Sequence, residues 1–318
     1  MKIIQNIENQ IRAEITKVSD RPFYSMEYHG DYCFDKYLLK GARNIDEFCS
    51  FIDKHLIFDG KKKVNRENFG CGVFTARNLD GDVIFARNMD CEYAIPMMIR
   101  LGEKNYKSLA LLNMAELDWD ENTYETLEAD PRLTLAAPYS PSDGMNEHGL
   151  AIAIMTDSSA IYPNSNPITL FDETLPRLIL DKAKTVDEAV QYAKKYNFFF
   201  SVAPLHYMVS DATGASAVIE FAGGRMVTTN NTKNYLTATN FTLYNNPNHE
   251  GFGKDRYDNI EDALKKCNGI LSEINALELL KKNVIPGDEQ WSAIYNLTRR
   301  SVMVAFSREY HHVYNYKL

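Results

Sequence analysis

Long apolar runs are missing from this sequence of 318 residues. A membrane-spanning helix needs about 20 consecutive, predominantly apolar residues, and no stretch approaches that length. The amino terminus, MKIIQNIENQIRAEITK, also lacks the apolar core of a secretory signal. These absences exclude a membrane-spanning helix and predict a cytoplasmic protein.

An excess of positive charge is missing as well. Lysine and arginine number 35 against 43 aspartates and glutamates, so the formal net charge is −8. One compact basic run, Lys61-Lys62-Lys63, is too short to build a nucleic-acid surface. We therefore expect no nucleic-acid partner.

The cysteines do not form a disulfide framework. They are five, an odd number without framework spacing: Cys33, Cys49, Cys71, Cys91 and Cys267. In a reducing compartment such residues are thiols, most of them small buried hydrophobes. Metal-ligand spacing is absent too, because the adjacent His311 and His312 would point to opposite faces of a strand. We expect no metal and no other cofactor.

The composition that remains is that of a globular protein with a sizeable core, at 45% hydrophobic and 25% charged residues. Strand-like runs follow one another in hairpins from Cys71 onward. Helical spacing of apolar residues recurs in five segments: Asn44–Ile57, Phe171–Ala183, Thr185–Tyr196, Arg256–Lys266 and Ala276–Lys282. Hairpins with helices grouped between them predict an α+β fold of antiparallel sheets covered by helices.

Cys71 lies between two glycines at the mouth of a predicted hairpin. A thiol attacks acyl carbons as the thiolate, so it needs a nearby base or a positive field. Cleavage of the Gly70–Cys71 bond would give Cys71 a free α-amine with a pKa of roughly 7.7–8.0. Such an amine can act as the base for its own side chain.

The hairpin itself suggests partners for this cysteine. Val73–Arg77 and Val83–Arg87 read as strands, and a two-residue turn at Asp80-Gly81 would set Cys71 opposite Asp90. Directly opposed Cβ atoms lie about 4.5–5.5 Å apart. Since strict alternation puts Arg87 and Asp90 on opposite faces, both can reach the cysteine only if the strand bulges or ends early.

The segment CGVFTARNLDGDVIFARNMDCEY resembles the opening of the choloylglycine hydrolase family, which holds bile salt hydrolases and penicillin V acylases. Acid ceramidase, N-acylethanolamine acid amidase and the isopenicillin acyltransferases are its relatives. In that family the cysteine is followed by a hairpin ending in Gly-Arg-Asn-x-Asp, and Ala86 replaces the glycine here. The resemblance implies that Cys71 is the nucleophile and that Arg87 and Asp90 orient it.

Later segments extend the resemblance. SDGMNEHGLAIA (Ser142–Ala153) and LHYMVSDATGASAVIE (Leu205–Glu220) are similar to family segments, as is the Thr-Asn pair at Asn240. By that match Asn240 helps form the oxyanion hole, and Arg256 lies near the nucleophile at a helix start. Thr156 stands where bile salt hydrolases carry an asparagine, so the resemblance makes it a candidate substrate contact.

The resemblance implies the four-layer αββα sandwich of N-terminal-nucleophile hydrolases, with two antiparallel sheets. It also implies a zymogen, with residues 1–70 as a leading segment or small chain after self-cleavage and residues 71–318 as the hydrolase domain. The expected activity is hydrolysis of linear amide C–N bonds in N-acyl substrates such as bile-salt, fatty-acyl or penicillin V-like amides. The expected partner is a small-molecule amide, with a homo-oligomer left open.

Two other functions stay open on the sequence alone. An acyltransferase would pass the acyl group to an amine, and a non-catalytic binding protein would keep the fold without the reaction. His206 and His148 could partner a thiol, although no sequence feature selects either as a base. The aromatic segment Tyr196–Phe200 fits the core or a wall for an apolar acyl group.

Overall fold

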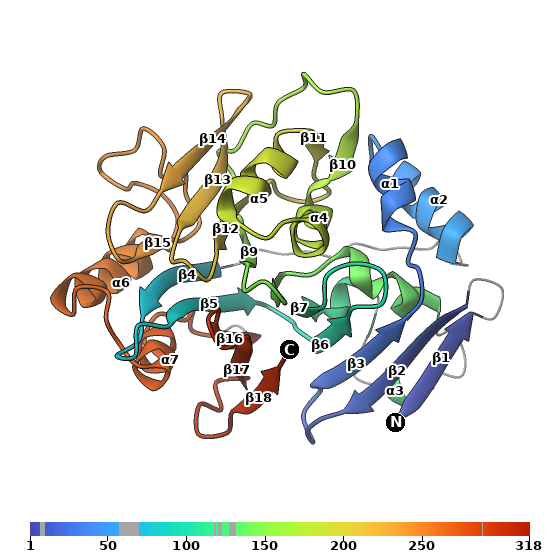
Figure 1. Cartoon of the computed structure of the whole chain (residues 1–318), viewed down its shortest axis with the longest axis horizontal. Helices are drawn as coiled ribbons and strands as arrows, with labels where there is room; N and C mark the ends of the chain where they lie inside the picture. Colours follow the sequence, from blue (N-terminus) through green and yellow to red (C-terminus); the bar gives the residue numbers. More distant parts are fainter. Residues whose placement is uncertain (7–9, 57–69, 118, 120–122, 127–131, 288) are drawn as a thin grey trace.

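The computed structural model describes residues 1–6, 10–56, 70–117, 119, 123–126, 132–287 and 289–318. Two large sheets dominate it (Figure 1). The ten-stranded sheet runs, in spatial order, β1 (Lys2–Asn6), β2 (Ile11–Lys17), β3 (Tyr24–His29), β6 (Pro96–Leu101), β7 (Ser108–Asn113), β8 (Asp143–Asn146), β9 (Ala151–Thr156), β12 (Leu205–Ser210), β13 (Ser216–Ala222) and β14 (Arg225–Asn230). The six-stranded sheet runs β15 (Leu236–Ala238), β4 (Gly70–Arg77), β5 (Val83–Cys91), β16 (Glu289–Asn296), β17 (Ser301–Phe306) and β18 (Tyr314–Lys317).

The remaining elements are mostly helices, with one small sheet of β10 (Thr169–Phe171) and β11 (Asn197–Phe199). The α-helices are α1 (Phe34–Lys40), α2 (Ile45–Leu56), α3 (Thr123–Thr126), α4 (Leu175–Lys182), α5 (Val186–Ala193), α6 (Lys254–Lys266) and α7 (Glu273–Lys281). The short 3-10 helices are η1 (Met114–Leu117), η2 (Arg132–Tyr139) and η3 (Asp172–Thr174). None of the helices in the described ranges is both long enough and apolar enough to cross a membrane.

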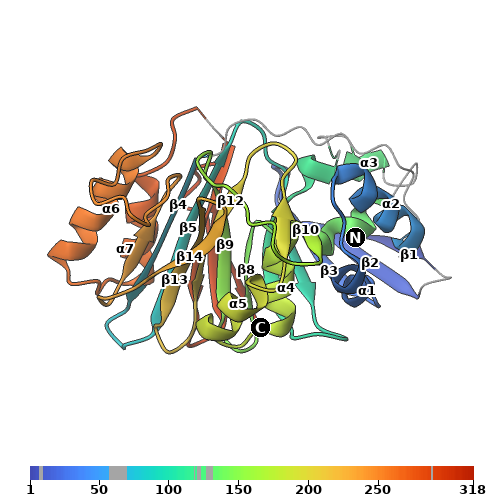
Figure 2. The ribbon, with the colours of Figure 1, turned by 90° about the horizontal axis from the view of Figure 1, so that it is seen from above.

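The layers follow from strand alternation. Val73 and Phe85 point from the six-stranded sheet into a core shared with Met145 and Met208 of the other sheet. Their strand neighbours on the opposite face pack against α6 and α7, while the outer face of the larger sheet packs against α4 and α5. Figure 2 shows the resulting order of helices, sheet, sheet and helices. The predicted α+β fold, a four-layer αββα sandwich, is confirmed.

The leading segment is built into this sandwich. Strands β1 to β3 extend the ten-stranded sheet, and β3 pairs with β6 in parallel, with Tyr24 opposite Met97. Helices α1 and α2 share the core of that sheet through residues such as Phe34 and Phe51. Every other pair in the described parts of the two large sheets is antiparallel. The parallel pair is allowed because β3 and β6 are joined by a long connection.

The register predicted for the β4–β5 hairpin is wrong by one residue. Cys71 lies opposite Met89, and Asp90 lies opposite Gly70. The loop is longer than a two-residue turn because Asn78 closes it by pairing with Asp82. Gly81 adopts a φ of 86°, the left-handed conformation that follows the turn in a three-residue hairpin loop.

Candidate active site

Cys71 is the first residue of β4 on the face turned toward the other sheet, and its side chain is 1% exposed. Its side chain belongs to the core between the two sheets. The Sγ atom lies 3.9 Å from the Sδ atom of Met89, its cross-strand neighbour. A reactive sulfur here would be shielded from bulk water, so the charged groups around it act at short range and with little screening.

Arg87 precedes Met89 by two residues in β5, so it lies on the same face, and it is fully buried. Its Nη2 atom lies 2.9 Å from Met89 Sδ, and its Nε atom donates to Asp143 Oδ2 at 2.7 Å. Burial by itself would lower the pKa of Arg87. Attraction to Cys71 and to Asp143 outweighs that effect and raises the pKa. Arg87 therefore stays charged beside the sulfur.

Asp143 was not among the residues selected from the sequence. It lies in β8 of the opposite sheet, 0% exposed. Besides Arg87, its carboxylate accepts hydrogen bonds from Trp291 Nε1 at 3.0 Å and from the Tyr295 hydroxyl. A buried carboxylate with three donors is well satisfied, so it can hold the Arg87 guanidinium in one orientation. Its position in SDGMNEHGLAIA, a segment similar to the family, was the available signal.

Asn240 connects the backbone of Cys71 to two other predicted residues. Its Oδ1 atom accepts from the Cys71 N–H at 2.7 Å and from Arg256 Nη2 at 3.0 Å. Its Nδ2 atom donates to Thr156, to the carbonyl oxygen at 3.0 Å and to Oγ1 at 2.9 Å. Two N–H donors face the Oδ1 atom of Asn240, and two acceptor oxygens face its Nδ2 atom. Only one of the two flipped orientations of the amide satisfies all four partners.

Arg256 reaches the site from the first turn of α6 and is 6% exposed. It donates from Nη1 to the carbonyl oxygen of Cys71 as well as to Asn240. The preceding Gly253, with a φ of 84°, makes room for it, because a Cβ atom at that position would lie 2.3 Å from Arg256 Nη2.

Asp90 lies on the other face of β5. The strand pairs with β16 without a bulge as far as Cys91, so Arg87 and Asp90 point in opposite directions. The Cβ atom of Asp90 lies 3.5 Å from where a side chain on Gly70 would begin. The structure thus brings Cys71, Arg87, Asn240, Arg256 and Thr156 together and places Asp90 beside the residue that precedes the cysteine.

A pocket opens beside Asn240. Its lining includes Phe241, Thr242, Phe252, Ser158 and Ser159. It is a mixed polar and aromatic space in direct contact with the amide group that lies next to Cys71. A substrate with its carbonyl at Asn240 could therefore extend into it.

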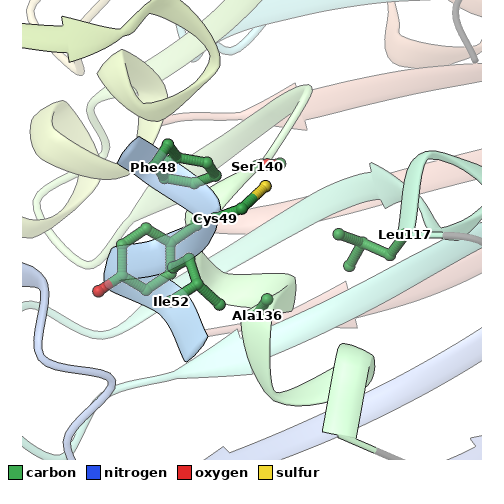
Figure 3. Close-up of a pocket in the computed structure, with 7 residues that line it drawn as sticks. Phe48, Cys49, Ile52, Leu117, Ala136 and Ser140 are labelled. Atoms are coloured by element: carbon green, nitrogen blue, oxygen red, sulfur yellow. The ribbon is translucent and has the colours of Figure 1, made fainter. Parts of the chain in front are cut away.

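A second, apolar pocket lies between α2 and η2. Phe48, Cys49 and Ile52 project into it from α2 toward Ala136 and Leu117 (Figure 3). Its lining includes none of the candidate site residues. The aromatic segment Tyr196–Phe200 does not line the space around Cys71 either. Phe198 is 5% exposed and packs in the core on the outer face of the larger sheet, whereas Cys71 belongs to the core between the two sheets.

Comparison with known proteins gives a family and a fold. Residues 71–262 match the sequence model of the linear amide C-N hydrolases, choloylglycine hydrolase family. The chain is 33% identical over 114 residues to a penicillin V acylase of Pectobacterium atrosepticum, a match that covers 32% of this chain and 30% of that protein. It is 28% identical over 164 residues to a bile salt hydrolase/transferase of Clostridium perfringens, covering 47% of each. The matches thus span between about a third and a half of these relatives' length.

Solved structures with similar folds cover more of the chain. A conjugated bile acid hydrolase from Clostridium perfringens has a TM-score of 0.57 at 15% identity, over 78% of this chain and 92% of that one. A penicillin V acylase from Agrobacterium tumefaciens has a TM-score of 0.53 at 18% identity, over 74% and 83%. At these identities the likeness concerns the fold.

Proposed function

Because this chain belongs to the choloylglycine hydrolase family of linear amide C-N hydrolases, we propose that it is an autoprocessed cysteine amidohydrolase acting on N-acyl amides through Cys71. The observation that carries the proposal is the convergence on this residue of Arg87 at its side chain and of Asn240 and Arg256 at its backbone. A buried thiol with a fixed cation and an amide donor nearby has the parts that acyl transfer needs.

The first step is cleavage of the chain. The Cys71 sulfur attacks the carbonyl carbon of Gly70, the C–N bond breaks, and a thioester forms while the Cys71 nitrogen becomes a free amine. Water then hydrolyses the thioester to the Gly70 carboxylate and the Cys71 thiol. Asp90 lies on the face of Gly70, and we assign it to holding the amine that forms there.

Turnover repeats this chemistry on an external amide. The α-amine of Cys71 takes the thiol proton, the sulfur attacks the substrate carbonyl, and the proton passes to the departing amine. Water hydrolyses the resulting acyl-enzyme. In the uncleaved chain both N–H groups of Asn240 point at Thr156, so one must turn to the oxyanion once the peptide ahead of Cys71 is gone. Thr156 then lines the substrate carbonyl.

The leading segment is proposed to stay bound as a small chain after cleavage. Its contacts with the rest of the protein are buried and extensive, since β3 pairs along β6 and Tyr32 donates to Asp181 at 2.6 Å. Loss of one peptide bond removes none of these contacts. Residues 71–318 would form the large chain, and its matured cysteine would lie at the site described above.

A panel of amides tests the proposed function. We expect intact mass to show that the purified protein consists of two chains. We also expect this protein to release acid from N-acyl amides such as fatty-acyl ethanolamides, acyl-glycine conjugates or penicillin V. Adding amine acceptors should leave the acid as the main product, whereas transfer to the amine would identify an acyltransferase. An uncut chain whose Cys71 does not react with electrophiles would indicate a binding protein instead.

Asn240→Ala should lower kcat by about 10²–10³-fold, because a lost oxyanion donor costs about 2.7–4 kcal/mol in the transition state. The measurement is steady-state hydrolysis of whichever panel amide the wild type cleaves best. Asn246→Ala is the matched control, since Asn246 lines the same pocket but donates to the carbonyls of Thr242 and Glu250. Equal losses of kcat in the two variants would count against an oxyanion role.

A further inference from the structure

His206 is a buried histidine directly behind the segment that carries Asn240. It lies in β12 and is 0% exposed. Its Nε2 atom is 2.7 Å from the carbonyl oxygen of Thr239, the residue before Asn240. Since a carbonyl oxygen can only accept, Nε2 carries the proton of this hydrogen bond.

The other ring nitrogen faces a carboxylate. Nδ1 of His206 lies 3.9 Å from Oε1 of Glu220, which is 0% exposed on the neighbouring strand β13. Burial alone would lower the pKa of His206. The interaction with Glu220 and the charge of Asp157 outweigh it, so the pKa is raised. The positive charge of an imidazolium suits a position beside this buried carboxylate.

Both carboxylates also hold the chain that follows Asn240. Glu220 accepts from the backbone N–H of Leu243 and, at 3.2 Å, from that of Tyr244. Asp157 accepts from the hydroxyl of Thr242. His206 is therefore the cation between two anions that fix residues 242–244, while its own Nε2–H fixes residue 239.

We propose that His206 is a positioning residue for the oxyanion donor, acting by holding the Thr239 carbonyl and, through Glu220 and Asp157, the segment around Asn240. The proposal rests on the function proposed above. His206 is not a base for the thiol in this scheme, because its two nitrogens are directed at Thr239 and Glu220. Its effect is geometric, and displacement of a catalytic group by about 1 Å can cost about 10²-fold in rate.

The test distinguishes an effect on the oxyanion donor from an effect on the reactivity of the Cys71 sulfur. Alkylation of Cys71 by iodoacetamide needs the thiolate but forms no oxyanion, whereas amide hydrolysis needs both. His206→Phe, which removes the donor to Thr239, should lower kcat by about 10–10²-fold while KM and the alkylation rate stay within about 3-fold of wild type. His206→Gln, which keeps an N–H near the Nε2 position, should recover most of the lost kcat.

Tyr207→Phe is the matched control. It removes a hydrogen bond from the same strand, to the carbonyl of Asp172 at 2.9 Å, on the face turned away from Asn240. We expect it to keep wild-type kcat. If His206→Phe does not fold, Glu220→Gln tests the link from the other side and should lower kcat several-fold.

Four results would overturn the proposal. The first is a wild-type kcat in His206→Phe or, if that variant does not fold, in Glu220→Gln, and the second is a kcat in His206→Gln as low as in His206→Phe. The third is an equal loss of kcat in Tyr207→Phe, and the fourth is an alkylation rate that falls in parallel with kcat. These results differ from a failure of the proposed function, in which the wild-type protein itself would hydrolyse no amide.

Discussion

Cys71→Ala should leave the protein as one polypeptide of 36.4 kDa and lower amide hydrolysis by at least about 10³-fold. The alanine variant has no nucleophile to open the Gly70 carbonyl, so no α-amine forms. It also has no sulfur to carry an acyl group, so both steps of the proposed reaction stop together. Intact mass reports the first loss and acid release from an N-acyl amide reports the second.

The control for this variant is Cys91→Ala. Cys91 is another free, buried thiol of the same core, 1% exposed. Its pKa is raised, chiefly by burial and also by nearby negative groups including Glu116. Such a thiol is unreactive near neutral pH. We expect Cys91→Ala to be cut and active, so processing or hydrolysis that survives Cys71→Ala would contradict the assignment of the nucleophile.

Asp143→Asn should lower the free energy of unfolding by about 3–5 kcal/mol and also greatly lower activity. Both side chains of the Arg87–Asp143 pair are 0% exposed. Breaking a buried pair leaves one charge without compensation, which costs about 3–5 kcal/mol. Without its anchor the Arg87 guanidinium can also turn away from Cys71. Denaturant unfolding followed by Trp fluorescence measures the first effect, and kcat the second.

A double variant separates charge burial from catalysis. Arg87→Met with Asp143→Asn removes both charges, and replacement of a whole buried pair is often neutral or stabilising. We expect it to regain much of the stability lost in Asp143→Asn and none of the activity. If the double variant regained both stability and activity, the pair would serve the fold alone. If Asp143→Asn were as stable as wild type, the pair would not be the buried contact described here.

Local patterns in the sequence were sufficient for several elements. The predicted strands Val73–Arg77 and Val83–Arg87 lie within β4 and β5. The predicted helical segment Thr185–Tyr196 contains α5, and Thr185 caps it with its hydroxyl accepting from the Glu188 N–H. The predicted helix Asn44–Ile57 is observed as Ile45–Leu56, and Ile57 lies outside the described residues. Each of these depends on side chains a few residues apart.

The β4–β5 hairpin shows a feature that local sequence patterns predicted wrongly, the register of its two strands. Asp-Gly predicted a tight turn, but the side chain of Asn78 accepts from the N–H groups of both Asp80 and Asp82 and lengthens the loop. A shift of one residue exchanges the faces of a strand. Met89 consequently lies opposite the cysteine, and Asp90 lies beside Gly70.

By itself, the sequence determined the class of fold, the family and the existence of the hairpin that begins at Cys71. Only the tertiary structure decided that Arg87 pairs with Asp143, 56 residues away and in the other sheet, and that Asn240 meets the backbone of Cys71 across 169 residues. It also decided that the leading segment completes a sheet through the parallel pairing of β3 with β6. The reason is physical: alternation and turn chemistry act over a few residues, whereas buried charges find partners wherever packing brings distant strands face to face.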